Sequence, residues 1–191
     1  MDNTLTIAVL AGTTREQRRS IKAAHYVADY GRGLPGIEII FVDPKDFHFE
    51  GDGNDPEGKD PRYTEIVQKA DAFFVVMPEY NHSIPGSLKR MMDSELEAYK
   101  HKPVAIAGVS KSSWGGVRGV EALVTSVRQM GLVATSYSMY FPRVQDLFNE
   151  QGELLPEYRE LYDANAKRAY DELLWMARAL RHARLADQAN S

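Results

Sequence analysis

The stretch Ala72-Phe73-Phe74-Val75-Val76-Met77 is apolar at every position and stops at Pro78. An uninterrupted apolar run of this length is typical of a central strand in a parallel sheet, because helices cover both faces of such a strand. The residues after Pro78 are polar and aromatic, so we expect a loop to begin at the end of the most buried strand.

Four further runs read as strands around this one, at residues 5–10, 37–42, 104–109 and 132–136. Segments with helical spacing of apolar residues separate them, at residues 17–30, 62–69, from about 84 and at 116–130. Strands that alternate with helices predict an α/β fold with a parallel sheet and helices on both faces. Five strands with this spacing indicate a doubly wound sheet of flavodoxin type, in the order 2-1-3-4-5. Such folds bind ligands beyond the carboxyl ends of the strands, where the strand order reverses.

Length and composition are those of an ordinary soluble domain. The 191 residues carry no repeat or linker, so we expect one domain over 1–191 with a helical extension from about residue 155. The net charge of −4 offers no basic face for nucleic acid or an anionic membrane. The absence of cysteine excludes disulfides, thiolate nucleophiles and iron–sulfur clusters. We find no signal peptide and no membrane span, and expect a cytoplasmic protein.

The loop after the first strand, Gly12–Ser20, gathers hydroxyl and guanidinium groups where a helix begins. Free backbone N–H groups at a helix N-terminus attract phosphate, and arginine adds charge and a forked donor. Taken alone, the loop fits a phosphate site and an ordinary capped, solvated first turn about equally well.

The loop after the third strand, Pro78–Gly86, is dense in specific groups. A flat heteroaromatic ring needs backbone donors and acceptors along its edge and a side chain against its face. Tyr80 and the backbone of 79–81 are able to supply these, although Pro and Asn also favour a plain β-turn. His82 lies in the same loop, where we favour a position facing water.

The loop after the fourth strand, Ser110–Gly116, ends in two glycines, which allow close approach to a ligand and positive φ. Trp114 either shields a ring or fills a core or subunit contact, and the sequence does not choose between them.

Together these loops resemble the NADPH-dependent FMN reductase family, over residues 5–133. The segment Pro78-Glu79-Tyr80-Asn81-His82-Ser83-Ile84-Pro85-Gly86-Ser87-Leu88-Lys89 is similar to the family signature almost residue for residue. The first loop resembles the family's Gly-Ser-x-Arg phosphate loop with Thr13 in place of serine. Ser113-Trp114-Gly115-Gly116 resembles the third loop, where an aromatic residue precedes paired glycines.

The resemblance implies FMN, reduced by NADPH or NADH and reoxidised by a second substrate in a ping-pong reaction. Quinones, azo dyes, free flavins and metal oxyanions are the acceptors it implies, and a homodimer or higher homo-oligomer is the expected assembly. The chemistry belongs to the cofactor, so we name no catalytic residue and no metal ligand. Carried over, the phosphate would be held by Thr13, Arg15, Arg18 and Ser20, with the choice between Arg18 and Arg19 open. The isoalloxazine would be bordered by Pro78, Glu79, Tyr80, Asn81 and Ser83, and closed in by Ser113, Trp114, Gly115 and Gly116.

Two departures from the family pattern stand out. Asp93 is followed by Ser94-Glu95 where the family often has an aromatic residue, and the segment Asp43–Asp60 is unusually acidic. We expect the acidic segment to alter the mouth of the active site.

Two other motifs fail on context. Gly31–Gly36 fits a dinucleotide fingerprint but follows a helix and precedes a strand, the reverse of what that motif requires. Gly53–Lys59 approximates a P-loop, but Asp60 stands where Ser or Thr should bind magnesium. The rival functions are a flavodoxin-like electron carrier and a nucleotide-binding α/β protein without flavin.

Overall fold

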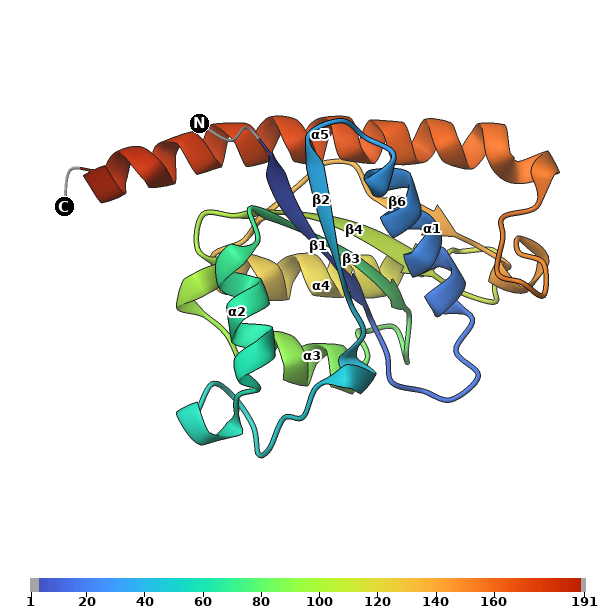
Figure 1. The fold of residues 1–191 in the computed structure, drawn as a ribbon. Coiled ribbons are helices and arrows are strands. Elements are labelled where there is room, and N and C mark those ends of the chain that lie inside the picture. The colour runs from blue at the N-terminus through green and yellow to red at the C-terminus, as the bar shows by residue number, and fades with distance from the viewer. Residues whose placement is uncertain (1–3, 190–191) are drawn as a thin grey trace.

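The structure, a computed structural model, describes residues 4–189. A twisted parallel sheet lies between two layers of helices, and one long helix runs across the top of the view in Figure 1. The strands are β1 (Leu5–Ala11), β2 (Ile37–Val42), β3 (Ala72–Pro78), β4 (Pro103–Val109), β5 (Val133–Ala134) and β6 (Met139–Phe141). The helices are α1 (Ser20–Arg32), α2 (Pro61–Lys69), α3 (Gly86–Asp93), α4 (Val117–Gln129) and α5 (Pro156–Ala189). Short 3-10 turns occupy Pro44–Asp46, Pro56–Gly58, Glu97–Tyr99 and Val144–Asp146.

The strand order is β2-β1-β3-β4-β5 with every pair parallel, which confirms the predicted flavodoxin-like order. β3 is the central strand: Phe73 lies opposite Ala8 of β1 and Val104 of β4. Its residues from Ala72 to Met77 are all buried, as the continuous apolar run indicates. The point where the order reverses lies between β1 and β3.

The fifth strand predicted at 132–136 is shorter in the structure, because β5 covers only Val133–Ala134 and a separate short strand, β6, follows it. β5 pairs with the start of β4 through Val133 and Pro103, whereas β6 pairs with its end through Met139 and Ala107. Between them, the Glu172 carboxylate of α5 accepts the backbone N–H groups of Ser136 and Tyr137 at 2.7 and 3.0 Å. A side chain from a distant helix thus satisfies amides that the interrupted ladder leaves unpaired. The sheet therefore has six strands where five were predicted.

Each face of the sheet has its own apolar core, and Figure 1 shows the helices that cover each face. α1 and α5 cover one face, and α2, α3 and α4 cover the other. Successive residues of β1 point to opposite cores, with Ile7 and Val9 in the first and Ala8 and Leu10 in the second.

α5 is one continuous helix of 34 residues. Its inner face packs on the sheet, and the hydroxyl of Tyr170 donates to the Val27 carbonyl of α1 at 2.8 Å. Despite its length, α5 is too polar to cross a membrane, and no other helix within residues 4–189 meets the requirement.

The acidic segment 43–60 is held to α3 by the side chains of two residues. The Arg90 guanidinium donates to the carbonyls of Gly51, Gly53 and Gly58 at 2.7, 2.9 and 3.0 Å, and to that of Glu50. Glu95 is buried and accepts from Lys59 at 3.4 Å and from the hydroxyl of Thr64. The two departures from the family pattern are therefore connected, because the glutamate after Asp93 forms an ion pair with a lysine of the unusual segment.

Asp60 ends this segment and caps α2. Its buried carboxylate accepts the N–H groups of Arg62 and His48, both at 3.0 Å. The hydrogen bond from the Arg62 side chain is the main reason that the pKa of Asp60 falls to about 2.

We expect Asp60→Ala to lower the free energy of unfolding by about 1–2 kcal/mol, because α2 loses its cap and the His48 amide its acceptor. The folded pKa lies below the unfolded value of about 3.9, so the contribution is present above pH 4 and is lost as the pH falls toward 2. Urea titrations at pH 7 and at pH 3 measure both effects. Asp60→Asn is the matched control, since it keeps the capping oxygen. An alanine variant as stable as the wild type at pH 7 would contradict the assignment.

Candidate functional site

The loops after β1, β3 and β4 meet at the carboxyl edge of the sheet, around a cavity of about 460 Å³. It is lined by Thr13, Arg15, Glu16, Gln17, Arg18, Arg19, Ser20, Pro78, Glu79, Tyr80, Val109, Ser110, Lys111 and Val144. The three loops singled out in the sequence therefore form one site.

Gly12 allows the first loop to reach the second. Its backbone N–H donates to the Val76 carbonyl at 2.9 Å, and a Cβ at this position would lie 2.3 Å from Cβ of Met77. No side chain fits in that space, so the close approach requires glycine. Beyond it, the hydroxyls of Thr13 and Tyr80 lie 3.0 Å apart and join the two loops by a hydrogen bond.

The first loop leaves donors unused. The backbone N–H groups of residues 16–19 donate to no acceptor within residues 4–189, and Arg19, at the N-cap of α1, provides no side-chain cap. The guanidinium groups of Arg15 and Arg19 have no carboxylate partner among the described residues. Unpaired amides at a helix N-terminus together with two uncommitted cations are the donor set that a phosphate dianion requires.

Arg18 is committed elsewhere. Its guanidinium forms a two-pronged ion pair with Asp43, at 2.7 Å for Nη1 to Oδ1, and also donates to the Thr13 carbonyl. Burial alone would raise the pKa of Asp43, but the hydrogen bonds from Arg18 and from the Lys45 amide, together with the charges of both residues, hold that pKa below its usual value. Arg18 thus fastens the first loop to the end of β2, while Arg19 is free of such a pair.

The second loop contains a tight turn of unusual handedness. The backbones of Tyr80 and Ser83 exchange hydrogen bonds of 2.9 and 2.8 Å, and between them Asn81 and His82 have φ angles of 51° and 62°. Two consecutive positive φ values define a type I′ turn, which favours Asn-Gly. Asn81 fits this preference, but His82 occupies a position suited to glycine, and such strain concentrates at functional sites.

Glu79 links the second loop to the start of α4, the helix that directly follows the third loop. Its carboxylate accepts the N–H groups of Arg118 and Gly119 at 3.0 and 3.3 Å, and so caps α4 from outside the helix. The side chain of Glu79 is therefore engaged, and its backbone is the part left for a ligand.

The paired glycines of the third loop are required by the protein's own backbone. Gly115 and Gly116 have φ angles of 66° and 89°, and a Cβ on either would lie within 3 Å of Tyr140 or of the Val109 amide. Trp114 is 63% exposed, and its ring lies against the Arg118 guanidinium, 5.5 Å from the ring centre.

Six of the residues predicted to bind the cofactor do not line the cavity. They are Asn81, Ser83, Ser113, Trp114, Gly115 and Gly116.

Several residues that line the cavity were not predicted from the sequence to bind the cofactor. Ser110 and Lys111 lie at the start of the third loop, where a closer weighting of the residues directly after the strand would have found them. Val144 comes from the turn after β6 and carries no sequence signal, because only the pairing of β6 with β4 brings it to the site.

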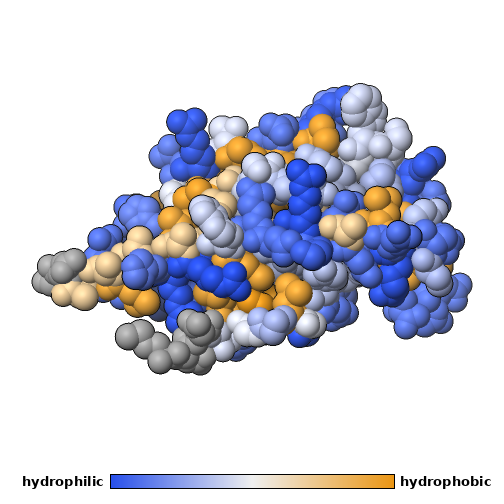
Figure 2. All heavy atoms as spheres, turned by 90° about the horizontal axis from the view of Figure 1, so that it is seen from above, coloured by the Kyte–Doolittle hydropathy of each residue, from blue (hydrophilic) through white to orange (hydrophobic). Residues whose placement is uncertain are grey.

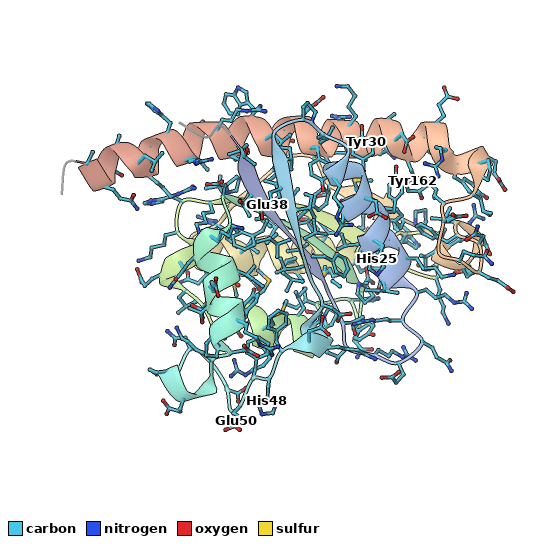
Figure 3. The ribbon with its side chains drawn as sticks, in the orientation of Figure 1. His25, Tyr30, Glu38, His48, Glu50 and Tyr162 are labelled. Atoms are coloured by element: carbon cyan, nitrogen blue, oxygen red, sulfur yellow. The ribbon has the colours of Figure 1, made fainter. Side chains whose placement is uncertain are left out.

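The larger groove of the protein and two of its histidines, His25 and His48, lie apart from this site. A larger groove of about 900 Å³ runs along α1 toward the turn at 150–154 and touches none of the loops after β3 and β4. In Figure 3, His48 and Glu50 lie at the outer end of segment 43–60, and His25 lies on α1, where it stacks on Phe41 at 4.4 Å. We therefore assign the chemistry to the smaller cavity, where the unpaired donors are.

Fold and site together define a flavodoxin-type α/β protein with a cavity at the switch point of its sheet, lined by backbone and guanidinium donors. Residues 5–145 match the family model of the NADPH-dependent FMN reductases, and the chain belongs to that family. It is therefore an oxidoreductase with FMN as cofactor and NADPH or NADH as electron donor.

Known proteins agree with this assignment. A quinone reductase of Pseudomonas putida is 24% identical over 171 residues, which cover 86% of this chain and 92% of the relative. An NADPH azoreductase of a Bacillus species is 27% identical over 122 residues, 63% of this chain and 67% of the relative. Among solved structures, the flavoenzyme FerB, an NAD(P)H:(acceptor) oxidoreductase of Paracoccus denitrificans, has the same fold, with a TM-score of 0.74 and 21% identity. That similarity covers 92% of this chain and 98% of FerB.

The strained turn yields a prediction. We expect His82→Gly to raise the free energy of unfolding by about 1 kcal/mol, because glycine adopts positive φ without steric cost. His82→Ala is the control, since it removes the imidazole but keeps the strain. Chemical denaturation of the three proteins measures the difference. A glycine variant less stable than the alanine variant would mean that the turn is not strained at this position.

Proposed function

We propose that the protein catalyses a ping-pong reaction in which NADPH or NADH reduces bound FMN and a small-molecule acceptor reoxidises it. The observation that carries this proposal is the set of unpaired donors in the first loop, which share one cavity with Pro78, Glu79 and Tyr80 of the second loop. FMN supplies the hydride and electron chemistry when bound, and the protein binds it, orients it and controls access.

The residues divide into two roles in this proposal. The phosphate is held by Arg15, Ser20 and the amides of 16–19, with Arg19 preferred to Arg18 because Arg18 is paired with Asp43. The backbone of 79–81 borders the edge of the isoalloxazine, and Tyr80 is kept in place by its bond to Thr13. Asn81, Ser83 and residues 113–116 belong to the proposed ring site as the walls on either side of it.

Quinones and azo compounds are the acceptor classes that we favour, because relatives are named for them. We infer a cytoplasmic location, where reduced nicotinamide nucleotides are available. The rival function is that of an electron carrier without nicotinamide turnover. It is kept because a short-chain flavodoxin shares the fold at a TM-score of 0.58.

Anaerobic spectroscopy separates the two functions. The protein reconstituted with FMN should be yellow, should bleach on addition of NADPH or NADH, and should regain its colour when a quinone is added. Initial rates at several quinone concentrations should give parallel double-reciprocal lines, because the first product leaves before the acceptor binds. A yellow protein that neither nucleotide bleaches would favour the carrier, and a protein that takes up no FMN would contradict both.

The phosphate site can be tested through paired variants. Arg15→Ala should weaken FMN binding by about tenfold or more, since a charge-assisted hydrogen bond is lost. Arg18→Ala and Asp43→Ala should each have a smaller effect through the position of the loop. Their double variant should bind FMN no more weakly than Arg18→Ala alone, because the two residues act as one pair. Fluorescence titration of FMN measures all four affinities. A loss from Arg18→Ala that exceeds that from Arg15→Ala would reverse the assignment.

A further inference from the structure

A second pocket lies at the edge of the sheet where the strands begin, and we call it the amino-edge pocket. It has a volume of about 370 Å³ and is lined by residues just before β3 and β4 and by the C-terminal part of α5. In Figure 1 this edge is on the left, where α5 extends past the start of β1. The cavity of the candidate site lies at the other end of the strands, about 20 Å away, and the two pockets share no described residue.

Cations outnumber carboxylates in the amino-edge pocket. The charged side chains that line it are the cations Lys100, Lys102, Arg181 and Arg184 and the carboxylates Asp71 and Glu97. Glu97 pairs with Lys100 at 2.7 Å. Asp71 is shared by the two arginines, at 3.4 and 3.3 Å, and also accepts the N–H of Thr6 at 3.1 Å. The charge of Lys102 and one charge of the arginine pair therefore have no carboxylate of their own within residues 4–189.

Lys102 carries one of these two charges into the protein. The residue is only 7% exposed, and its ammonium donates to the carbonyls of Val67 and Gln68 at 2.6 and 3.1 Å, at the end of α2. Burial, followed by repulsion from Arg184, lowers the pKa of Lys102 to about 8, so the side chain is still mostly charged at pH 7. An ammonium has three N–H donors, and the third is left for another acceptor.

The two arginines lie one turn apart on the same side of α5 and keep part of their donors unused. Arg181 donates through Nη1 to the Thr4 carbonyl at 2.6 Å, and Arg184 donates through Nη1 to the His101 carbonyl at 2.7 Å. Nε and Nη2 of Arg181 and Nε of Arg184 reach no acceptor within residues 4–189. Burial lowers the pKa of Arg184 and repulsion from Arg181 adds to it, although Asp71 acts in the opposite direction. Like charges held this close are stabilised when an anion joins them.

We propose that the amino-edge pocket binds a small ligand with a phosphate group, whose oxygens accept hydrogen bonds from Lys102, Arg181 and Arg184. A dianion matches the two positive charges that lack a carboxylate, and guanidinium groups match the oxygens of a phosphate in geometry. Leu185 adds apolar surface to the lining, and Figure 2 shows hydrophilic side chains beside apolar ones toward the left, where α5 ends. The volume is in the range of small-ligand sites, so it takes free phosphate or a small phosphate ester. This inference goes beyond the proposed function, because the pocket shares no residue with the cavity of the candidate site.

Calorimetric titration of the FMN-loaded protein with inorganic phosphate tests the proposal, because bound FMN keeps phosphate away from the first loop. Gln188 is exposed, lines the pocket and forms no hydrogen bond within residues 4–189, so its substitution changes the charge of the pocket without removing a contact. Gln188→Lys should strengthen phosphate binding and Gln188→Glu should weaken it, each by about two- to fivefold. Gln151→Glu is the matched control, since it makes the same change of charge in the groove along α1 and should leave the affinity unchanged. A chain that takes up no FMN is still tested, because the two Gln188 variants act only on this pocket.

Removal of a proposed contact gives the larger effect. Arg184→Gln should weaken phosphate binding by about tenfold or more, since charge-assisted hydrogen bonds are lost, and circular dichroism checks that α5 remains folded. Titration with phenyl phosphate distinguishes the two sources of the group: tighter binding than that of phosphate identifies an ester, and weaker binding identifies the free anion. A wild type that binds neither compound, or an equal effect of Gln188→Glu and Gln151→Glu, would overturn the proposal.

Discussion

The site depends on the contact between Gly12 and Met77. The backbone of the first loop lies directly on the end of the central strand, with its amide bonded to the Val76 carbonyl and no room for a side chain. From that contact the hydroxyl of Thr13 reaches Tyr80, and the loops after β1 and β3 become one surface. Any residue larger than glycine would push the two loops apart and open the switch point of the sheet, where the ligand has to bind.

Charges at the site have two separate tasks. Arg18, Asp43 and Glu79 are engaged in holding the three loops to one another and to α4. Among residues 4–189, Arg15, Arg19 and the amides at the start of α1 have no such partner, which is why we propose them for the phosphate. This division follows from electrostatics: a paired, nearly buried guanidinium is already neutralised, whereas an unpaired one beside a helix N-terminus adds its charge to the helix dipole.

Two features of this protein are additions to the basic flavodoxin-type fold. The acidic segment 43–60 is held under α3 by Arg90 and by the buried ion pair of Glu95 with Lys59, so it is an ordered wall. α5 continues past the sheet, and Trp175 on its outer face is 70% exposed.

The sequence by itself determined the fold class, because an apolar run such as Ala72–Met77 fits a strand covered on both faces, and the alternation of strands with helices indicated the strand order of a flavodoxin-type sheet. It also determined the three loops, since loops after neighbouring parallel strands always meet at one edge. Only the tertiary structure decided which cation in the first loop is free, because the partner of Arg18 lies 25 positions away at the end of another strand. It also decided that Gly115 and Gly116 make room for β4 and Tyr140, that Val144 reaches the site, and that β6 follows β5 as a separate short strand beside β4. Each of these depends on contacts between residues distant in the chain, and local patterns of hydrophobicity carry no record of such contacts.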